Sequence, residues 1–143
     1  MTYEHIVYLI KATCLKCDET GSILVGRRPD ASLITVNGSA PLMFLYYPDF
    51  TAKGQANETV RISMLFLQQD DPNNNEGQRI TIHNNMKVLS DLFLRTFVSS
   101  IQVAGSTAVY NADKRQMPED RILAGTMSGF GISFTITIKT KQC

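Results

Sequence analysis

The sequence has no apolar run that approaches the ~18 residues of a membrane-spanning helix, so we expect no transmembrane segment. It also lacks the basic start of a secretory signal, because its first apolar stretch is interrupted by Lys11 and Lys16. The formal net charge is only +1. The overall charge balance therefore gives no reason to expect nucleic acid, a membrane surface or an acidic molecule as a partner.

Residues that commonly perform chemistry are also scarce. The chain has 3 cysteines, an odd number that favours a reducing compartment over a disulfide framework. Its 2 histidines, His5 and His83, have no sequence feature that would make them acid–base catalysts, and no Gly-x-Ser-x-Gly nucleophile elbow is present. We therefore expect a cytosolic protein that is not an enzyme and that uses no cofactor and no metal ion.

The composition is that of a globular protein, with 43% hydrophobic and 19% charged residues. A chain of 143 residues is close to the commonest domain size, and it can bury roughly two-thirds of its unfolded surface. We find no internal repeat and no boundary between parts of different composition. The sequence therefore predicts a single domain over residues 1–143.

Hydrophobic periodicity predicts the order helix, three strands, helix, two strands. Apolar residues at steps of three and four predict helices over residues 3–17 and 81–101. Continuous or alternating apolar runs predict strands at residues 33–36, 42–47, 60–67, 107–111 and 130–139, the first two of them as a hairpin. Short connections then indicate an α+β fold with a mainly antiparallel sheet of about five strands and both helices on one face.

Cys14 and Cys17 have the spacing of a redox pair or of half a zinc site. A redox pair needs a preceding strand and a helix amino terminus, whereas both cysteines fall at the end of the first predicted helix, on its apolar stripe. His5 and His83 do not supply a second pair of zinc ligands. Core packing is the favoured interpretation, and metal or redox chemistry is the alternative.

Three glycines, Gly125, Gly129 and Gly131, superficially suggest a phosphate-binding loop. Such a loop is followed by a helix, whereas a predicted strand follows here. The glycines instead predict a bend or close packing where that strand begins.

The predicted order of elements covers nearly the whole chain, and three of its segments are the opening amphipathic helix, the central helix around residues 86–97 and the closing segment. In the closing segment Asp120-Arg-Ile-Leu-Ala-Gly125 leads into the alternating last strand. Together these segments resemble the tail terminator and tail-completion proteins of tailed bacteriophages.

This resemblance implies a structural virion protein that forms a homo-oligomeric ring, sixfold or twelvefold, in the phage neck or tail. Such a ring caps the tail tube or joins the portal to the tail, and it assembles in the cytoplasm of the bacterial host. The implied partners are further copies of the chain and adjacent neck, tail or portal proteins. DNA would meet the protein only by passing through the ring lumen, and no membrane is involved.

Under this interpretation two polar segments are the candidate contacts. Residues 68–79, which contain no aliphatic or aromatic side chain, would reach an adjacent ring or the lumen. Residues 113–121 would reach a neighbouring protomer. The candidate contact residues are Gln68, Asp70, Asp71, Asn74, Glu76, Arg79, Lys114, Arg115, Glu119 and Arg121.

Two other functions remain open. One is a small cytosolic α+β binding or catalytic domain that uses Cys14 and Cys17. The other is a nucleic-acid-binding protein, because aromatic side chains on strands can stack on bases. Here, however, the aromatic residues of the last strand alternate on the face predicted to be buried.

Overall fold

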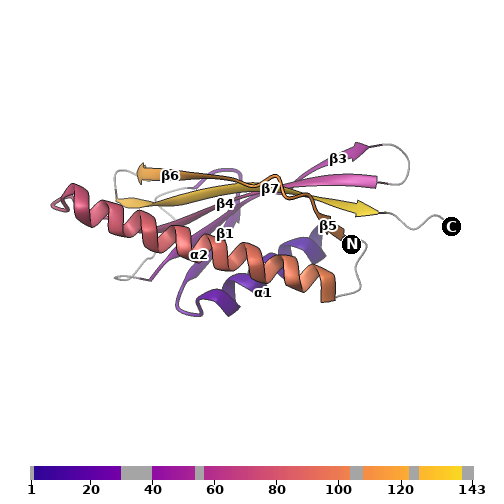
Figure 1. Ribbon diagram of the computed structural model, residues 1–143, viewed down its shortest axis with the longest axis horizontal. Helices are drawn as coiled ribbons and strands as arrows, with labels where there is room; N and C mark the ends of the chain where they lie inside the picture. Colours follow the sequence, from indigo (N-terminus) through magenta and orange to yellow (C-terminus); the bar gives the residue numbers. More distant parts are fainter. Residues whose placement is uncertain (1, 30–39, 54–56, 104–107, 123–125, 140–143) are drawn as a thin grey trace.

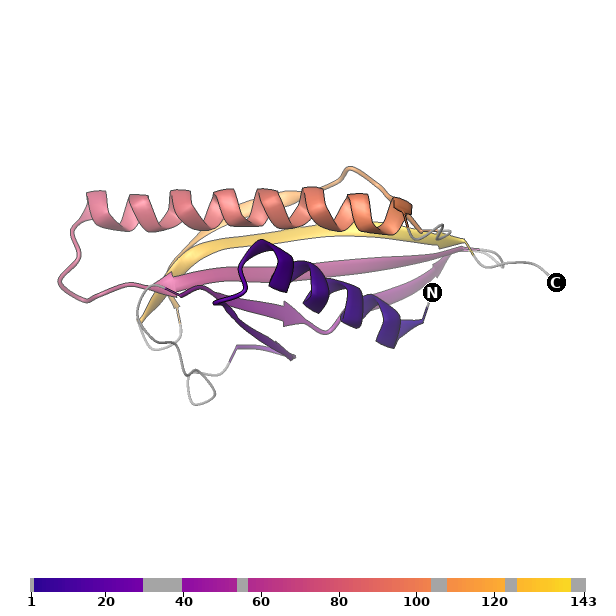
Figure 2. The same cartoon turned by 90° about the horizontal axis from the view of Figure 1, so that it is seen from below.

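The computed structural model describes residues 2–29, 40–53, 57–103, 108–122 and 126–139. Over these residues two helices cover one face of a mixed sheet of seven strands (Figures 1 and 2). The elements in chain order are α1 (Tyr3–Cys17), β1 (Ser22–Gly26), β2 (Leu42–Tyr46), β3 (Asp49–Lys53), β4 (Asn57–Gln69), α2 (Glu76–Val103), β5 (Ala108–Tyr110), β6 (Arg115–Arg121) and β7 (Met127–Lys139). The predicted α+β class is confirmed.

Two long antiparallel strands, β4 and β7, form the centre of the sheet and pair from Asn57 with Lys139 to Gln69 with Met127. The strands β2 and β3 follow one another along the outer edge of β4, and β5 and β6 do the same along the outer edge of β7. The strand β1 pairs with β2 in parallel. The seven strands therefore occupy five side-by-side positions, with β1 at one lateral edge and β5 and β6 at the other.

The predicted sheet of about five mainly antiparallel strands is thus only partly right. The parallel β1–β2 pair makes the sheet mixed, and β1, β3 and β6 were not predicted. The strand β6 reads Arg-Gln-Met-Pro-Glu-Asp-Arg, a composition with little strand propensity. It is a strand because the outer edge of β7 offers backbone partners, and such pairing outweighs propensity. Residues 113–121 are therefore mostly strand rather than a charged connection.

The predicted polar segment at residues 68–79 is also shorter than expected. The strand β4 continues through Gln69 and α2 begins at Glu76, so only residues 70–75 connect them. A reciprocal cap starts the helix: the Asn75 amide donates to Gln78 Oε1 at 2.8 Å, and the Gln78 amide donates to Asn75 Oδ1 at 2.9 Å. The predicted strand over residues 33–36 lies outside the described residues.

The helix α1 has the predicted bounds. Thr2 caps its amino end by accepting a 3.2 Å hydrogen bond from the His5 amide, and its buried stripe includes Ile6, Ile10 and Cys14. No helix in the described part of the chain is both long and apolar enough to cross a membrane.

The main core lies between the helices and the sheet. Its largest fully buried side chains include the aromatic residues Phe66, Phe93, Phe97 and Phe134, which form a chain of ring contacts. A smaller apolar cluster occupies the opposite face of the sheet, where it comprises Leu42, Phe44, Leu65, Leu67 and Met127. The side chains of the strands are therefore apolar on the helix side and mixed on the other side, which we call the open face.

Candidate interaction surfaces

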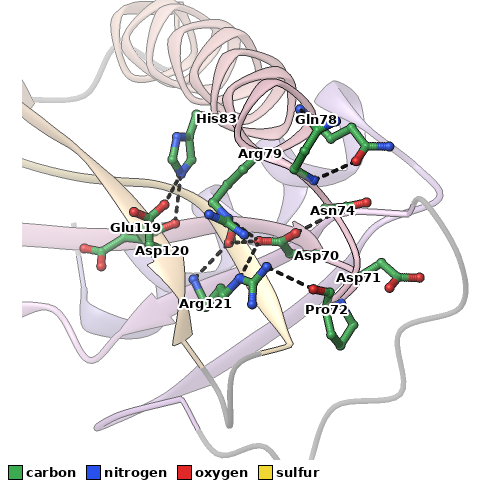
Figure 3. Close-up of polar contacts among 12 residues, drawn as sticks. Asp70, Asp71, Pro72, Asn74, Gln78, Arg79, His83, Glu119, Asp120 and Arg121 are labelled. Carbon is green, nitrogen blue, oxygen red and sulfur yellow. Dashed lines mark hydrogen bonds and ion pairs between the residues drawn. The ribbon is translucent and has the colours of Figure 1, made fainter.

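The two predicted contact segments meet at Asp70, whose side chain is fully buried (Figure 3). Its Oδ2 atom accepts hydrogen bonds from Ser128 Oγ at 2.7 Å and from Arg79 Nε at 3.0 Å. Its Oδ1 atom accepts one from Asn74 Nδ2 at 2.9 Å, and Arg121 Nε lies 3.7 Å from Oδ2. Asp70 thereby joins β4, α2, β6 and β7 at one end of the sheet.

Asp70 is an ionised group held inside the protein. Burial raises the pKa of its carboxyl, but hydrogen bonds from Ser128, Asn74 and Arg79 outweigh that effect, so the pKa lies below its ordinary value. The charge of Arg79 is consequently neutralised within the protomer.

Arg121 completes this cluster in a conformation that few residues adopt. Its φ of 44° lies in the left-handed region, which costs energy for a residue with a side chain. Its amide donates to Ser128 Oγ at 2.9 Å and its guanidinium donates to the Pro72 carbonyl at 3.3 Å. These contacts hold the last residue of β6 against the loop that precedes α2.

The structure therefore brings together four of the ten candidate contact residues, Asp70, Asn74, Arg79 and Arg121, and places them in contacts within the protomer. Of the other candidates in the first segment, Gln68 is half-buried in β4, while Asp71 and Glu76 are exposed.

The second segment is fastened to α2 along β6. Gln116 Nε2 donates to Asp91 Oδ1 at 2.7 Å, and His83 Nε2 lies 2.6 Å from Asp120 Oδ1. Lys114 Nζ lies 3.8 Å from the same Asp91 oxygen. These contacts fix the position of β6 at its edge of the sheet.

The alternate side chains of β6 point the other way, to the open face. Arg115, Met117 and Glu119 line a hollow of about 180 Å³ there, and we call these three residues the β6 stripe. Met117 is 50% exposed although it is apolar. The stripe thus presents a cation, an apolar group and an anion in that order.

Among the described residues eight large apolar side chains are exposed. A first group of four lies on α1 and the turn after β2 and comprises Tyr3, Tyr8, Leu15 and Tyr47. The other four are spread over α2, β5 and β6 and are Ile80, Val88, Val109 and Met117, the last of them on the open face. Because β1 and the β5–β6 pair are at opposite ends of the strand order, the first group and Met117 flank opposite edges of the sheet.

The first group borders a hollow of about 430 Å³ between α1 and β1, which we call the α1 hollow. It is lined by Tyr3, Glu4, Val7, Tyr8, Lys11, Val25 and Tyr47. The lining residues of α1 recur at helical spacing, so they share one flank of the helix beside its buried stripe, and Val7 on this flank also packs against the core. Glu4 and Lys11 stand at the two ends of this lining.

The α1 surface was not predicted from the sequence, although large apolar residues outside the buried stripe of the helix could have indicated it. Tyr8 and Leu15 are 69% and 52% exposed, and they lie seven residues apart, which places them on one side of the helix. Both lie off the stripe formed by Ile6, Ile10 and Cys14. Tyr8 lines the α1 hollow together with Tyr3 and Tyr47, so exposed aromatic side chains gather at this surface.

The two helical cysteines lie in surroundings that disfavour the thiolate. Burial, together with the neighbouring Cys17, raises the pKa of Cys14 to about 12. Burial also raises the pKa of Cys17, whose Sγ lies 4.0 Å from Thr96 Oγ1. Because the thiolate is the nucleophile and the metal ligand, both environments oppose the alternative redox or zinc role.

A larger polar hollow of about 520 Å³ lies on the open face, at the other end of the strands from Asp70. Asp113 lines this hollow and accepts hydrogen bonds from the Thr135 amide at 2.9 Å and from Thr135 Oγ1 at 2.7 Å. Burial raises the pKa of Asp113, but these hydrogen bonds and the nearby Arg61 hold it below its ordinary value. Asn111 also forms hydrogen bonds within the hollow: its Nδ2 donates to Thr135 Oγ1, and its Oδ1 accepts from Thr137 Oγ1.

Among the described residues no three His, Cys, Asp or Glu side chains are grouped so that they could hold a metal ion. A scan of the sequence against protein-family models matches no family, and a search of curated proteins finds no match.

Proposed function

We propose that this protein is a structural subunit of a tailed bacteriophage, which forms a homo-oligomeric ring in the neck or tail. The observation that carries this proposal is exposed apolar surface at both lateral edges of the sheet, with Tyr3, Tyr8 and Tyr47 around the α1 hollow and Met117 on β6. Soluble monomers rarely expose apolar surface in patches unless a partner covers it.

The placement of these two surfaces favours a ring over a twofold dimer. A twofold dimer uses one self-complementary patch, whereas a ring subunit docks one patch on a different patch of its neighbour. The α1 hollow and the β6 stripe are different surfaces at opposite edges of the sheet, which fits the second arrangement. Subunits joined edge to edge in this way close on themselves when the rotation between neighbours divides a full turn, as in a sixfold or twelvefold ring.

The two candidate contact segments have separate roles in this proposal. The exposed residues of β6 reach the neighbouring protomer, because Arg115 and Met117 lie at the lateral edge of the sheet. The loop before α2 and the first residue of that helix, with exposed Asp71 and Glu76, reach an adjacent ring or the lumen through which DNA passes. The cluster around Asp70 holds this loop in place for that contact (Figure 3).

The alternative function, a binding or catalytic domain built on Cys14 and Cys17, has less support. Both thiols have raised pKa values, and no further ligand joins them among the described residues. In the polar hollow on the open face, Asn111 and Asp113 are both hydrogen-bonded to Thr135 within the protomer.

The proposal is tested by locating the protein in phage particles. Antibody-linked gold is imaged by electron microscopy on particles of the phage that encodes the chain, with an antibody to the capsid protein as the control. We expect label at the head–tail junction or at the end of the tail. Label on the capsid surface, or protein that is absent from purified particles, would contradict the proposal.

A further inference from the structure

We propose that the ring contact is head to tail, with the β6 stripe of one protomer docked in the α1 hollow of a second copy of this chain. This inference rests on the proposed ring function and names the surfaces that join neighbouring subunits. It follows from the order of charges on the two surfaces, from their lengths and from their positions in the fold.

The β6 stripe is a short amphipathic surface that borders the hollow of about 180 Å³ on the open face, with the half-exposed Met117 at its centre. Arg115, Met117 and Glu119 are alternate residues of one strand, so their side chains leave the same face. Between them, Gln116 points to the helix side and donates to Asp91, which fixes the strand. The distance from the first to the last of the three along the strand is roughly 13 Å, at about 3.3 Å per residue.

The α1 hollow has the opposite order of charge. Glu4 and Lys11 stand at its ends, and Val7 and Tyr8 lie between them on the same side of the helix. Seven residues of helix separate the two charges, which is roughly 10 Å at about 1.5 Å per residue. The buried residues Ile6 and Ile10 hold the helix to the core, so the hollow is fixed in place.

The two surfaces match when they are laid against each other. Glu4 of one copy then meets Arg115 of the next, and Lys11 meets Glu119, with long side chains that absorb the small difference in length. Met117 falls at the centre, against the apolar and aromatic lining. An apolar anchor inside a rim of paired opposite charges is the usual anatomy of a protein interface.

Their positions allow the contact to propagate. The α1 hollow lies at the β1 edge on the helix side of the sheet, because Val25 in its lining pairs with Leu45 of the main core. The β6 stripe lies at the opposite edge on the open face, because Met117 pairs with Gly131 beside Leu65. One protomer therefore overlaps the next, open face on helices, and each keeps its second surface available.

Continuous strand pairing between protomers is the less suitable contact for this edge. Pro118 has no amide hydrogen, and it sits in the middle of β6 among charged residues, a combination that protects a sheet edge from strand addition. Side-chain docking through the β6 stripe needs no backbone hydrogen bond from Pro118.

Charge reversal with mixing tests the contact. Glu4→Arg places a cation opposite Arg115, and Arg115→Glu places an anion opposite Glu4, so each variant alone should associate at least ~10-fold more weakly than the unmodified chain. An equimolar mixture of the two should recover the association. In an alternating ring every hollow then meets a complementary stripe, which requires an even number of subunits.

Glu19→Arg is the matched control, because Glu19 is an exposed acidic residue just after α1 that lines neither the α1 hollow nor the hollow beside the β6 stripe. It should leave association unchanged. Sedimentation velocity measures association over a range of concentrations, and thermal unfolding verifies that every variant is folded. If Glu4→Arg has no effect, or if the mixture does not recover, the head-to-tail contact is wrong. If Glu4→Arg has no effect but Arg115→Glu weakens association, the contact is instead a twofold one between the β6 stripes of two protomers.

Photo-cross-linking detects the same contact when the chains associate too weakly for sedimentation velocity to measure. A photoreactive phenylalanine analogue replaces Met117, and ¹⁵N-labelled and unlabelled chains are mixed before irradiation and peptide mass spectrometry. We expect mixed-isotope products that link position 117 to peptides of α1. Rings that form but cross-link elsewhere would overturn this contact and leave the ring function standing. A chain that stays monomeric and is absent from particles would overturn the ring function as well.

Discussion

Ser128 Oγ lies 2.7 Å from Asp70 Oδ2, although 58 positions separate the two residues along the chain. The pair joins the end of β4 to the start of β7, and both side chains are buried. The same carboxylate accepts from Arg79 and Asn74, so it fixes the loop and the beginning of α2 as well. One buried charge therefore organises the end of the sheet where the two predicted contact segments meet (Figure 3).

Asp70→Asn should destabilise the protein, because it removes the charge that Arg79 and Arg121 face and replaces one acceptor oxygen by a donor. Charge-assisted hydrogen bonds of this kind each contribute about 1.5–3 kcal/mol, and we expect a loss of roughly 2–3 kcal/mol in the free energy of unfolding. Urea denaturation measures it. The matched control is Asp71→Asn at the exposed neighbouring position, which should change the stability by less than ~0.5 kcal/mol. Equal effects at the two positions would show that the cluster does not stabilise the fold.

Stability should fall in acid. Hydrogen bonds and nearby cations outweigh burial and hold the pKa values of Asp70, Asp91 and Asp113 below their ordinary value of about 4. A carboxyl whose folded pKa is depressed stabilises the protein above its unfolded pKa, and this contribution is lost as the pH falls through the folded pKa. The urea midpoint should therefore be steady above pH ~5 and decrease below pH ~4. The decrease should be smaller in Asp70→Asn, and an identical decrease in that variant would contradict the assignment.

Gly129→Ala should be strongly destabilising. A methyl group at this position would overlap the Phe66 carbonyl oxygen of β4, which is backbone and cannot move aside cheaply. Overpacking of this kind typically costs about 1–3 kcal/mol. In Gly131→Ala the added group would lie 3.3 Å from Leu65 Cδ2 and 3.4 Å from Glu119 Oε1, which are the ends of flexible side chains. Thermal unfolding of the two variants should show the larger loss for Gly129→Ala, and the reverse order would be inconsistent with this packing.

Cys14 should resist alkylation at neutral pH, because its pKa is raised to about 12 and its side chain is buried. In a Cys143→Ser background, iodoacetamide should label Cys17 more slowly than a free thiol and Cys14 only after denaturation. Peptide mass spectrometry assigns the labelled site. Rapid labelling of Cys14 in the folded protein at pH 7 would revive the redox or zinc alternative.

The strongest periodic segments were predictable from the sequence. The stripe of Ile6, Ile10 and Cys14 predicts α1 with its observed bounds, and the alternation after Phe130 predicts most of β7. Close packing at the start of that strand was also predicted, and it is confirmed at Gly129, where β4 backbone approaches. Gly125 lies outside the described residues. Such elements can be predicted from the sequence because one face of each is buried, so apolar residues recur with the period of the helix or strand.

The segments that depend on distant partners were not predictable in this way. The strand β6 exists because β7 pairs with it, and its Pro118 and charged residues carry no strand signal of their own. The sequence predicts residues 76–79 as part of a polar loop, whereas they form the first turn of α2, which Asn75 and Gln78 cap reciprocally. The burial of Asp70 was not predictable either. An aspartate in a polar segment is normally exposed, and only the fold brings Ser128 beside this one.

The oligomeric state of the purified, unmodified chain tests the ring most directly. Light scattering coupled to size-exclusion chromatography, with electron-microscopic class averages of the same peak, measures the mass and the symmetry. We expect a closed ring of six or twelve copies of the 15.9 kDa chain at high concentration or on addition of portal or tail-tube protein. A compact monomer under all of these conditions would contradict the account.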